Sequence, residues 1–216
     1  MIEIAIDGTA ASGKGTLAKK LAEKFGYAYL DTGLLYRKVA KELLIQKKNN
    51  SKEIEAFSCK IARSLDFLKL EDECLRTEET ANLASSIAIS PKLREILNLK
   101  QKEFVLKSKE KFSGCILDGR DIGTKILPNA NFKFFIDASV EIRAKRRLLE
   151  KNISFLHESD EKCMLHSLIK EMADRDKLDT NRLVSPLVPA NDAHVIDTSF
   201  MNADQLFLKV MKIIEG

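Results

Sequence analysis

The sequence predicts an α/β fold of three layers, in which helices cover both faces of a parallel, five-stranded β-sheet. Two observations carry this prediction. Five short apolar runs alternate along the 216 residues with longer stretches whose apolar residues recur at helical spacing. Polar turns follow several of these runs, so the groups that bind ligands are expected together at the carboxyl ends of the strands.

Each predicted element rests on its own local pattern. The predicted strands are residues 2–7, 27–30, 115–117, 132–136 and 194–196. The predicted helices are residues 17–25, 34–44, 52–65, 77–89, 91–104, a strongly basic helix from about 140, a helix from about 161 to 176, and 202–214. Thr77 and Ser90 are expected to cap two of them. Residues 66–75 predict a small hairpin, and a polar loop is expected from residue 177 to Pro186.

The stretch from Gly8 to Thr16, GTAASGKGT, fits the glycine-rich phosphate loop G-x-x-x-x-G-K. It follows the first predicted strand and opens the first predicted helix, so backbone N–H groups and the helix dipole favour an anion there. Gly8 and Gly13 allow the turn and the close approach of phosphate, and Lys14 adds a positive charge at the β/γ position. Gly15 stands where a metal-binding hydroxyl is usual, and Thr16 supplies a hydroxyl one place later. The sequence therefore predicts a nucleotide phosphate site that does not hold its metal in the commonest way.

A carboxylate and a set of arginines complete the predicted chemistry. Asp118 follows a predicted strand that should neighbour the first, where a carboxylate suits Mg²⁺, through water; a turn aspartate is the alternative. Guanidinium groups bind phosphate bidentately and keep their charge. The arginines at predicted strand ends, loops and the basic helix are Arg37, Arg94, Arg120, Arg143, Arg146, Arg147, Arg175 and Arg182. For the basic helix the alternative is an ordinary solvated face.

Composition narrows the class of protein. The chain is 44% hydrophobic and 31% charged, which is typical of a folded globular domain. No apolar run approaches the roughly 20 residues that span a bilayer, and the N-terminus offers no signal segment. The scattered cysteines 59, 74, 115 and 163 suggest neither a zinc site nor disulfides, so a reducing cytoplasm is expected. A net charge of +4 without tryptophan favours small anionic ligands over nucleic acid.

On these residues the chain resembles the bacterial cytidylate kinases of the nucleoside-monophosphate kinase group. The matching segments are IDGTAASGKGTLAKKLAEKFG, YLDTGLLYR, LRTEETAN, SPKLRE, LDGRDIGTKILPNANFKFFIDAS, EIRAKRR, RDKLDTNRLVSPLVPANDA and VIDTS. The resemblance implies a P-loop fold with a core of residues 1–31, 112–142 and 186–216. It also implies a monophosphate-binding (NMP-binding) insertion at 32–111 and a short helical lid with further contacts at 143–185.

The resemblance also implies a role for each matching residue in the transfer of the ATP γ-phosphoryl group to CMP or dCMP. It implies ATP binding by Gly8, Thr9, Ala10, Ala11, Ser12, Gly13, Lys14, Gly15, Thr16, Arg143 and Arg146. It implies CMP binding by Thr32, Tyr36, Arg37, Arg94, Arg120, Asp121, Arg175, Asp179 and Arg182. Catalytic contacts are implied for Lys14, Arg120, Arg147 and Arg175, and Mg²⁺ contacts for Asp118 and Thr16.

Two alternative functions stay open from the sequence. One is a monophosphate kinase that prefers UMP or AMP. The other is a nucleotide-binding, RNA-associated ATPase that uses the basic residues 92–111 and 143–151, although no helicase-type motif is present.

The sequence departs from the family pattern in two places. The family often has a longer insert than residues 66–75 provide, and the segment 107–114 is longer than usual in the family. A monomer without nucleic-acid or membrane partners is the expected state.

Overall fold

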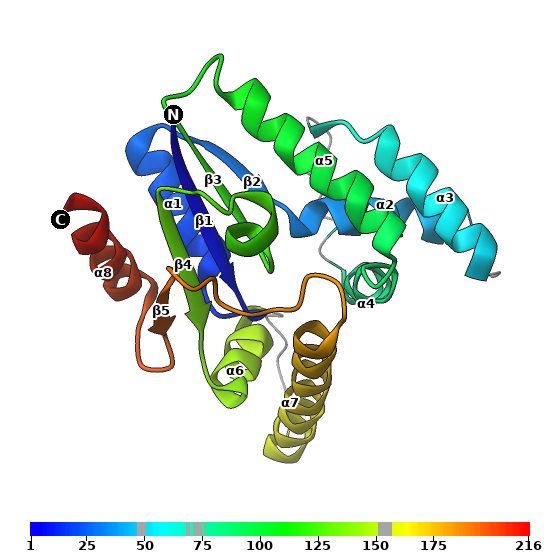
Figure 1. The fold of residues 1–216 in the computed structure, drawn as a ribbon. Helices are drawn as coiled ribbons and strands as arrows, with labels where there is room; N and C mark the ends of the chain where they lie inside the picture. The colour runs from blue at the N-terminus through cyan, green and yellow to red at the C-terminus, as the bar shows by residue number, and fades with distance from the viewer. Residues whose placement is uncertain (47–50, 68–69, 71–74, 76, 151–156) are drawn as a thin grey trace.

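Five parallel strands form the centre of the molecule (Figure 1). The computed structural model describes residues 1–46, 51–67, 70, 75, 77–150 and 157–216. The strands are β1 (Ile2–Gly8), β2 (Ala28–Asp31), β3 (Gly114–Gly119), β4 (Phe132–Asp137) and β5 (His194–Asp197), in the order β2-β3-β1-β4-β5. β1 lies in the middle, between β3 and β4, and Ile6 is in register with Asp118. The predicted sheet is confirmed, as is the expectation that the strand before Asp118 neighbours the first strand.

Helices cover both faces of this sheet. They are α1 (Lys14–Phe25), α2 (Gly33–Ile45), α3 (Ser51–Arg63), α4 (Glu78–Ile87), α5 (Pro91–Ser108), α6 (Val140–Glu150), α7 (Glu158–Asn181) and α8 (Ala203–Glu215). On one face, Ile4 and Ile6 of β1 pack with apolar residues of α1 and α8. On the other face, Ala5 and Leu117 pack with residues of α2, α3, α4 and α5. Because successive side chains of a strand point to opposite faces, β1 contributes to both cores, and the three-layer prediction is confirmed.

The two predicted N-caps are present at the starts of α4 and α5. The Ser90 hydroxyl accepts a hydrogen bond from the Leu93 N–H at 3.3 Å, with Pro91 at the first helical position of α5. The Thr77 hydroxyl accepts one from the Thr80 N–H at 3.3 Å and caps α4. These bonds satisfy backbone donors that a helix leaves free at its first turn, so both predicted caps are confirmed.

Two segments differ from the prediction. α7 continues to Asn181, so the polar loop expected from residue 177 is wrong over those positions. No glycine or proline interrupts the sequence between 158 and 181, and polar residues there continue the helix. Residues 122–126, which the sequence left without an element, form a π-helical turn, η3 (Ile122–Ile126). The predicted hairpin at 66–75 lies largely outside the described residues.

α6 and α7 form a third, smaller packed unit beyond the carboxyl ends of the strands (Figure 1). Leu148 of α6 packs with Leu168 and Met172 of α7, and Ala10 and Ala11 lie against them. The helix pair therefore borders the turn that follows β1. Among the described residues, no helix is long and apolar enough to cross a membrane.

Candidate active site

A cleft of about 830 Å³ opens at the carboxyl ends of β1, β2 and β3. One wall consists of the turn after β1 and the first residues of α1, and α4 and α5 form the opposite wall. Residues of α6, α7 and the 198–203 segment also line it. Parallel sheets bind ligands at this edge because the helix N-termini and the loops meet there.

The turn after β1 has the backbone of a phosphate loop. Gly8 has φ 148° and Gly13 has φ 96°, values that a side chain makes unfavourable. The Ser12 hydroxyl donates to the Thr9 carbonyl at 3.0 Å, and the Thr9 hydroxyl donates to the Asp137 carboxylate at 2.6 Å. α1 then begins at Lys14 with its first N–H groups directed into the turn. The loop is thus held in shape from behind while its front lines the cleft.

Lys14 and Asp118 lie together at the base of this cleft. The Lys14 ammonium donates to the Thr9 carbonyl at 3.2 Å, and burial followed by the nearby Arg120 charge lowers the pKa of Lys14. Burial, followed by the charge of Asp31, raises the pKa of Asp118, whose carboxylate accepts a hydrogen bond from Tyr29 at 2.6 Å. Both charges are costly to bury, so an anion that contacts Lys14 and a cation beside Asp118 would each offset part of that cost.

Asp118 and Asp31 offer oxygen ligands of the kind that Mg²⁺ prefers. A Cβ built on Gly15 would lie 3.6 Å from the Asp118 carboxylate, so the missing side chain leaves open space beside it. No group of three or more His, Cys, Asp or Glu side chains among the described residues could hold a metal by itself. This donor set fits Mg²⁺ that keeps water and phosphate ligands, as Mg²⁺ usually does.

The opposite wall contains a buried ion pair. Arg94 is 3% exposed and Asp121 is 7% exposed. An Nη of Arg94 lies 3.3 Å from the Asp121 carboxylate, and the Nε donates to the Ala88 carbonyl at 2.7 Å. The guanidinium also lies over the Tyr36 ring, 5.5 Å from its centroid. The pair presents one fixed acceptor and one fixed donor to a molecule in the cleft.

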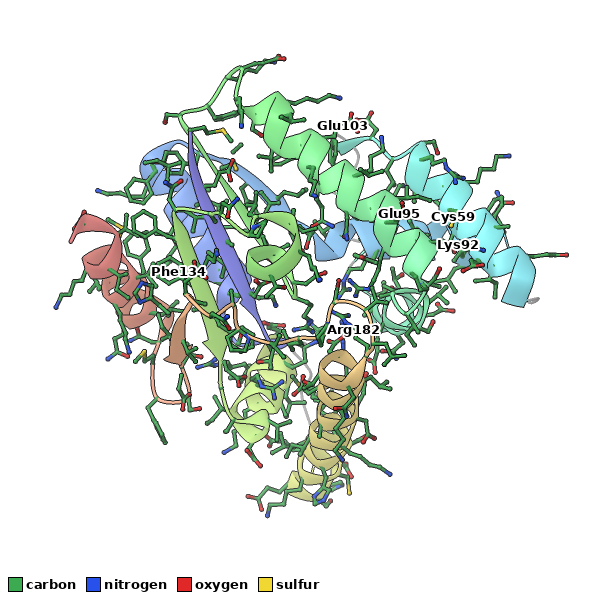
Figure 2. The ribbon with its side chains drawn as sticks, viewed as in Figure 1. Cys59, Lys92, Glu95, Glu103, Phe134 and Arg182 are labelled. Atoms are coloured by element: carbon green, nitrogen blue, oxygen red, sulfur yellow. The ribbon has the colours of Figure 1, made fainter. Side chains whose placement is uncertain are left out.

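Cations also lie between the two walls. Arg120 donates to the Gly8 carbonyl, and its Nε lies 3.0 Å from the Asp179 carboxylate. Asp179 also pairs with Arg182 at 3.2 Å, where α7 ends (Figure 2). Burial, followed by the charge of Arg120, lowers the pKa of Arg175 to about 10, so the group stays charged at neutral pH. Within the described part of the chain the buried Nε of Arg175 has no hydrogen-bond partner, which leaves it free for an anion.

Nearly the whole chain matches a known family. The family model described as "Cytidylate kinase" matches residues 4–216. The chain belongs to the cytidylate kinase family. A cytidylate kinase of Paramagnetospirillum magneticum is 44% identical over 211 residues, which cover 98% of this chain and 96% of that protein. A cytidylate kinase of Brucella suis biovar 1 is 42% identical over 212 residues, which cover 98% of this chain and 92% of the relative.

One solved structure supports the fold alone. A protein of Eubacterium ventriosum, described as uncharacterized, is similar with a TM-score of 0.52 and 18% identity. The match covers 100% of this chain and 99% of that chain. The TM-score shows that the arrangement of elements is shared, and an identity this low says nothing about the substrate.

Most of the site residues implied by the cytidylate kinase resemblance line the cleft. They are Ala10, Ala11, Ser12, Gly13, Lys14, Gly15, Thr16, Thr32, Tyr36, Arg37, Arg94, Asp118, Arg120, Asp121, Arg146, Arg147, Arg175, Asp179 and Arg182. Gly8 and Thr9, the first two residues of the loop, are buried. Their individual roles in binding stay predictions.

Arg143 does not line the cleft. It is 4% exposed, donates to the Ala138 carbonyl at 2.8 Å, and pairs with Asp176 at 2.5 Å. A further Nη lies 3.4 Å from the Ala10 carbonyl. Arg143 therefore joins α6, α7 and the back of the phosphate loop. Arg146, one turn later, lines the cleft and donates to the Thr198 and Met201 carbonyls at 2.6 and 3.1 Å.

The sequence interpretation missed the surface that α4 presents to the cleft. Ala81, Ala84, Ser85 and Ala88 line it and recur at helical spacing. Their side chains are small, and with Arg94 they form one side of the cleft. The signal was present in the sequence as a one-sided stripe of small residues, which a pattern search for apolar faces overlooks.

Proposed function

We propose that this member of the cytidylate kinase family transfers the γ-phosphoryl group of ATP, bound with Mg²⁺, to CMP or dCMP. The observation that carries the proposal is the position of the Arg120 and Arg175 cations between a phosphate loop and the buried Arg94–Asp121 pair. A donor phosphate on one wall and an acceptor phosphate on the other would meet at these two guanidinium groups. Membership of the family and the names of its relatives support the same reaction.

In the proposed reaction the phosphate loop holds the ATP phosphates, and Lys14 contacts the β- and γ-phosphates. Arg120 and Arg175 stabilise the charge on the group in transfer, as cationic clamps do in phosphoryl transfer. Arg37 and Arg94 hold the acceptor phosphate, Asp179 lies beside the sugar, and Arg182 contacts the phosphate or the base. The acceptor is a phosphate oxygen that is already ionised at neutral pH, so the chain supplies position and charge and needs no general base.

Asp118, through water, and Thr16 would hold Mg²⁺. When bound, the ion would supply charge neutralisation on the β- and γ-phosphates. The division into a core, an NMP-binding part at 32–111 and a lid at 143–185 is part of the same proposal. α6 and α7, which pack on one another and border the phosphate loop, support the lid assignment. Closure of these parts would keep water from the γ-phosphate.

A cytoplasmic enzyme of pyrimidine nucleotide metabolism fits these properties. Cys59, Cys115 and Cys163 are free thiols, in keeping with a reducing compartment. A monomer is the proposed state. No observation favours the RNA-associated ATPase, and nucleic acid and membranes are not among the proposed partners.

A panel of acceptors tests the proposal directly. ADP release in a coupled assay is expected to be fastest with CMP and dCMP, slower with UMP and slowest with AMP. EDTA in excess of Mg²⁺ is expected to abolish the activity. A clear preference for AMP or UMP would refute the cytidylate assignment. ATP hydrolysis that no monophosphate stimulates, together with tight RNA binding, would instead support the ATPase alternative.

Asp121→Asn is expected to lower the CMP-to-UMP ratio of kcat/KM by about tenfold. A carboxylate accepts a hydrogen bond from the cytosine amino group but repels the uracil carbonyl, whereas an amide can also donate. The ratio is the decisive quantity, because loss of the ion pair with Arg94 would weaken the binding of both CMP and UMP. Asp204→Asn removes an exposed carboxylate of α8 and should leave the ratio unchanged. An unchanged ratio in Asp121→Asn would show that this side chain does not read the base.

A further inference from the structure

Asp7 is a buried carboxylate whose function the phosphate-loop motif does not explain. It is the residue before Gly8, is 4% exposed, and does not line the cleft. Alternation along β1 places its side chain on the same face as Ala5, the face that packs against α2 to α5. η3 lies on this face directly over the end of β1.

The Asp7 carboxylate binds the backbone of η3 with both oxygens. One oxygen accepts the Ile122 N–H at 2.8 Å and the other accepts the Gly123 N–H at 2.7 Å. These are leading N–H groups of a short helical turn, and they are buried, so without a partner each would cost free energy. Asp7 therefore satisfies two donors at once and fixes the orientation of the peptide groups that follow Asp121.

Arg120 and Asp121 immediately precede these two peptide groups. Arg120 donates to the Gly8 carbonyl, the residue next to Asp7, and Asp121 pairs with Arg94. Two sets of hydrogen bonds thus join β1 to this segment. Asp7 of β1 binds the start of η3, and Arg120, just before η3, binds Gly8 at the end of β1. A shift of the Ile122 and Gly123 peptides would move both side chains.

The negative charge of Asp7 does not contribute to the stability of the fold. Burial raises the pKa of Asp7 to about 6, against the opposing effect of the two N–H bonds. A carboxyl whose pKa is higher in the folded state than in the unfolded state stabilises folding less when it is ionised. At neutral pH the carboxylate therefore costs the folded protein part of what its two hydrogen bonds contribute. A bidentate acceptor that sets a geometry accounts for this charge better than stability does.

We propose that Asp7 is a positioning residue, which holds the turn after Asp121 so that Arg120 and Asp121 meet the acceptor nucleotide in a fixed orientation. The proposal rests on the assignment of the Arg94–Asp121 wall to the acceptor. It adds that the strand carrying the ATP-binding loop also sets the geometry of the acceptor side. Asp7 itself would touch neither substrate.

Asp7→Asn separates this role from a structural one. The amide keeps the shape but has a single acceptor oxygen, so one of the two N–H groups loses its partner and faces another donor. The expected result is an increase of about tenfold in KM for CMP and a lower CMP-to-UMP ratio, with KM for ATP within about twofold of the original. The melting temperature should change little, because removal of the buried charge offsets the lost hydrogen bond.

Asp137→Asn is the matched control. Asp137 also ends a central strand and also braces the loop, but from the other side, by accepting the Thr9 hydroxyl at 2.6 Å. Its carboxylate otherwise accepts the Ala138 N–H, so it holds the loop and the start of the next segment rather than the turn at 120–123. Loss of the Asp137 carboxylate should therefore raise KM for ATP and leave the CMP-to-UMP ratio of kcat/KM unchanged. The two variants together distinguish positioning of the acceptor from general damage to the loop.

Gly123→Ala tests the same contact from the other partner and serves if Asp7→Asn does not fold. A Cβ on Gly123 would lie 3.4 Å from the Asp7 carboxylate and 3.3 Å from the Lys133 side chain, so either the turn or these side chains must give by a few tenths of an ångström. The same change in selectivity is expected, to a smaller degree. If the unmodified protein phosphorylates CMP but each of the two variants that folds keeps its KM for CMP and its selectivity, the inference is wrong. If the unmodified protein does not phosphorylate CMP, the proposed function itself fails.

Discussion

Lys14→Ala is expected to lower kcat by about 10³-fold while the protein remains folded. Lys14 is the first residue of α1, and its ammonium lies in the cleft within hydrogen-bond distance of the Thr9 carbonyl. A cation in this water-poor position stabilises charge that moves onto the β/γ-bridging oxygen during transfer, and alanine removes that interaction. The measurement is steady-state ADP release with saturating CMP and ATP.

The stability of the same variant is part of this prediction. Burial lowers the pKa of Lys14, so the folded state disfavours the charged amine. This cost is fully present at neutral pH, and alanine removes it, so the free energy of unfolding should be unchanged or higher. Lys20→Ala, which removes an α1 lysine paired with Asp204 at 2.5 Å, is the control and should retain kcat. A loss of less than tenfold in Lys14→Ala would remove this side chain from the proposed mechanism.

Gly8→Ala is expected to destabilise the protein by about 4 kcal/mol or more, or to prevent folding altogether. A Cβ at this position would lie 1.9 Å from the carbonyl oxygen of Ile136, and φ is 148°. The obstacle is backbone of the neighbouring strand β4, in register with Gly8, so no rotation of a side chain can relieve it. Relief requires that β1 and β4 separate at the point where the phosphate loop begins.

Gly26→Ala provides the comparison. Gly26 ends α1 with φ 63°, and a Cβ added there would meet none of the described residues within 4 Å. Only the left-handed conformation is penalised, at about 1–2 kcal/mol. Urea unfolding of the two variants should therefore separate a steric clash from a conformational cost. Equal destabilisation by both substitutions would show that the contact with Ile136 is not decisive.

The local pattern of the sequence was sufficient to predict the sheet and most helices. The apolar runs that became β1 and β4 are short, buried on both faces and followed by polar turns, so their period and length identify them. The Ser90 cap and the phosphate loop were predictable for the same reason, because their geometry depends on residues close together in the chain.

Features that depend on contacts between distant segments could not be predicted in this way. The last turns of α7 lack an apolar stripe because Arg175 and Asp179 face the cleft, and polar residues on a helix resemble a loop in sequence. Arg143 has the same local signature as Arg146, yet the pairing with Asp176 turns it away from the cleft. The bonds from Asp7 to η3 join residues more than a hundred positions apart.

α7 is a single uninterrupted helix from Glu158 to Asn181, and its last two turns hold two of the arginines near the phosphate loop. Its Asp176 holds Arg143 at the back of the phosphate loop, and Asp179, less than one turn later, holds Arg120. A stiff helix transmits a tilt along its whole length, so these two attachments cannot adjust separately. We therefore expect the affinities for the two proposed nucleotides to be linked through α7, each substrate changing the dissociation constant of the other by the same factor.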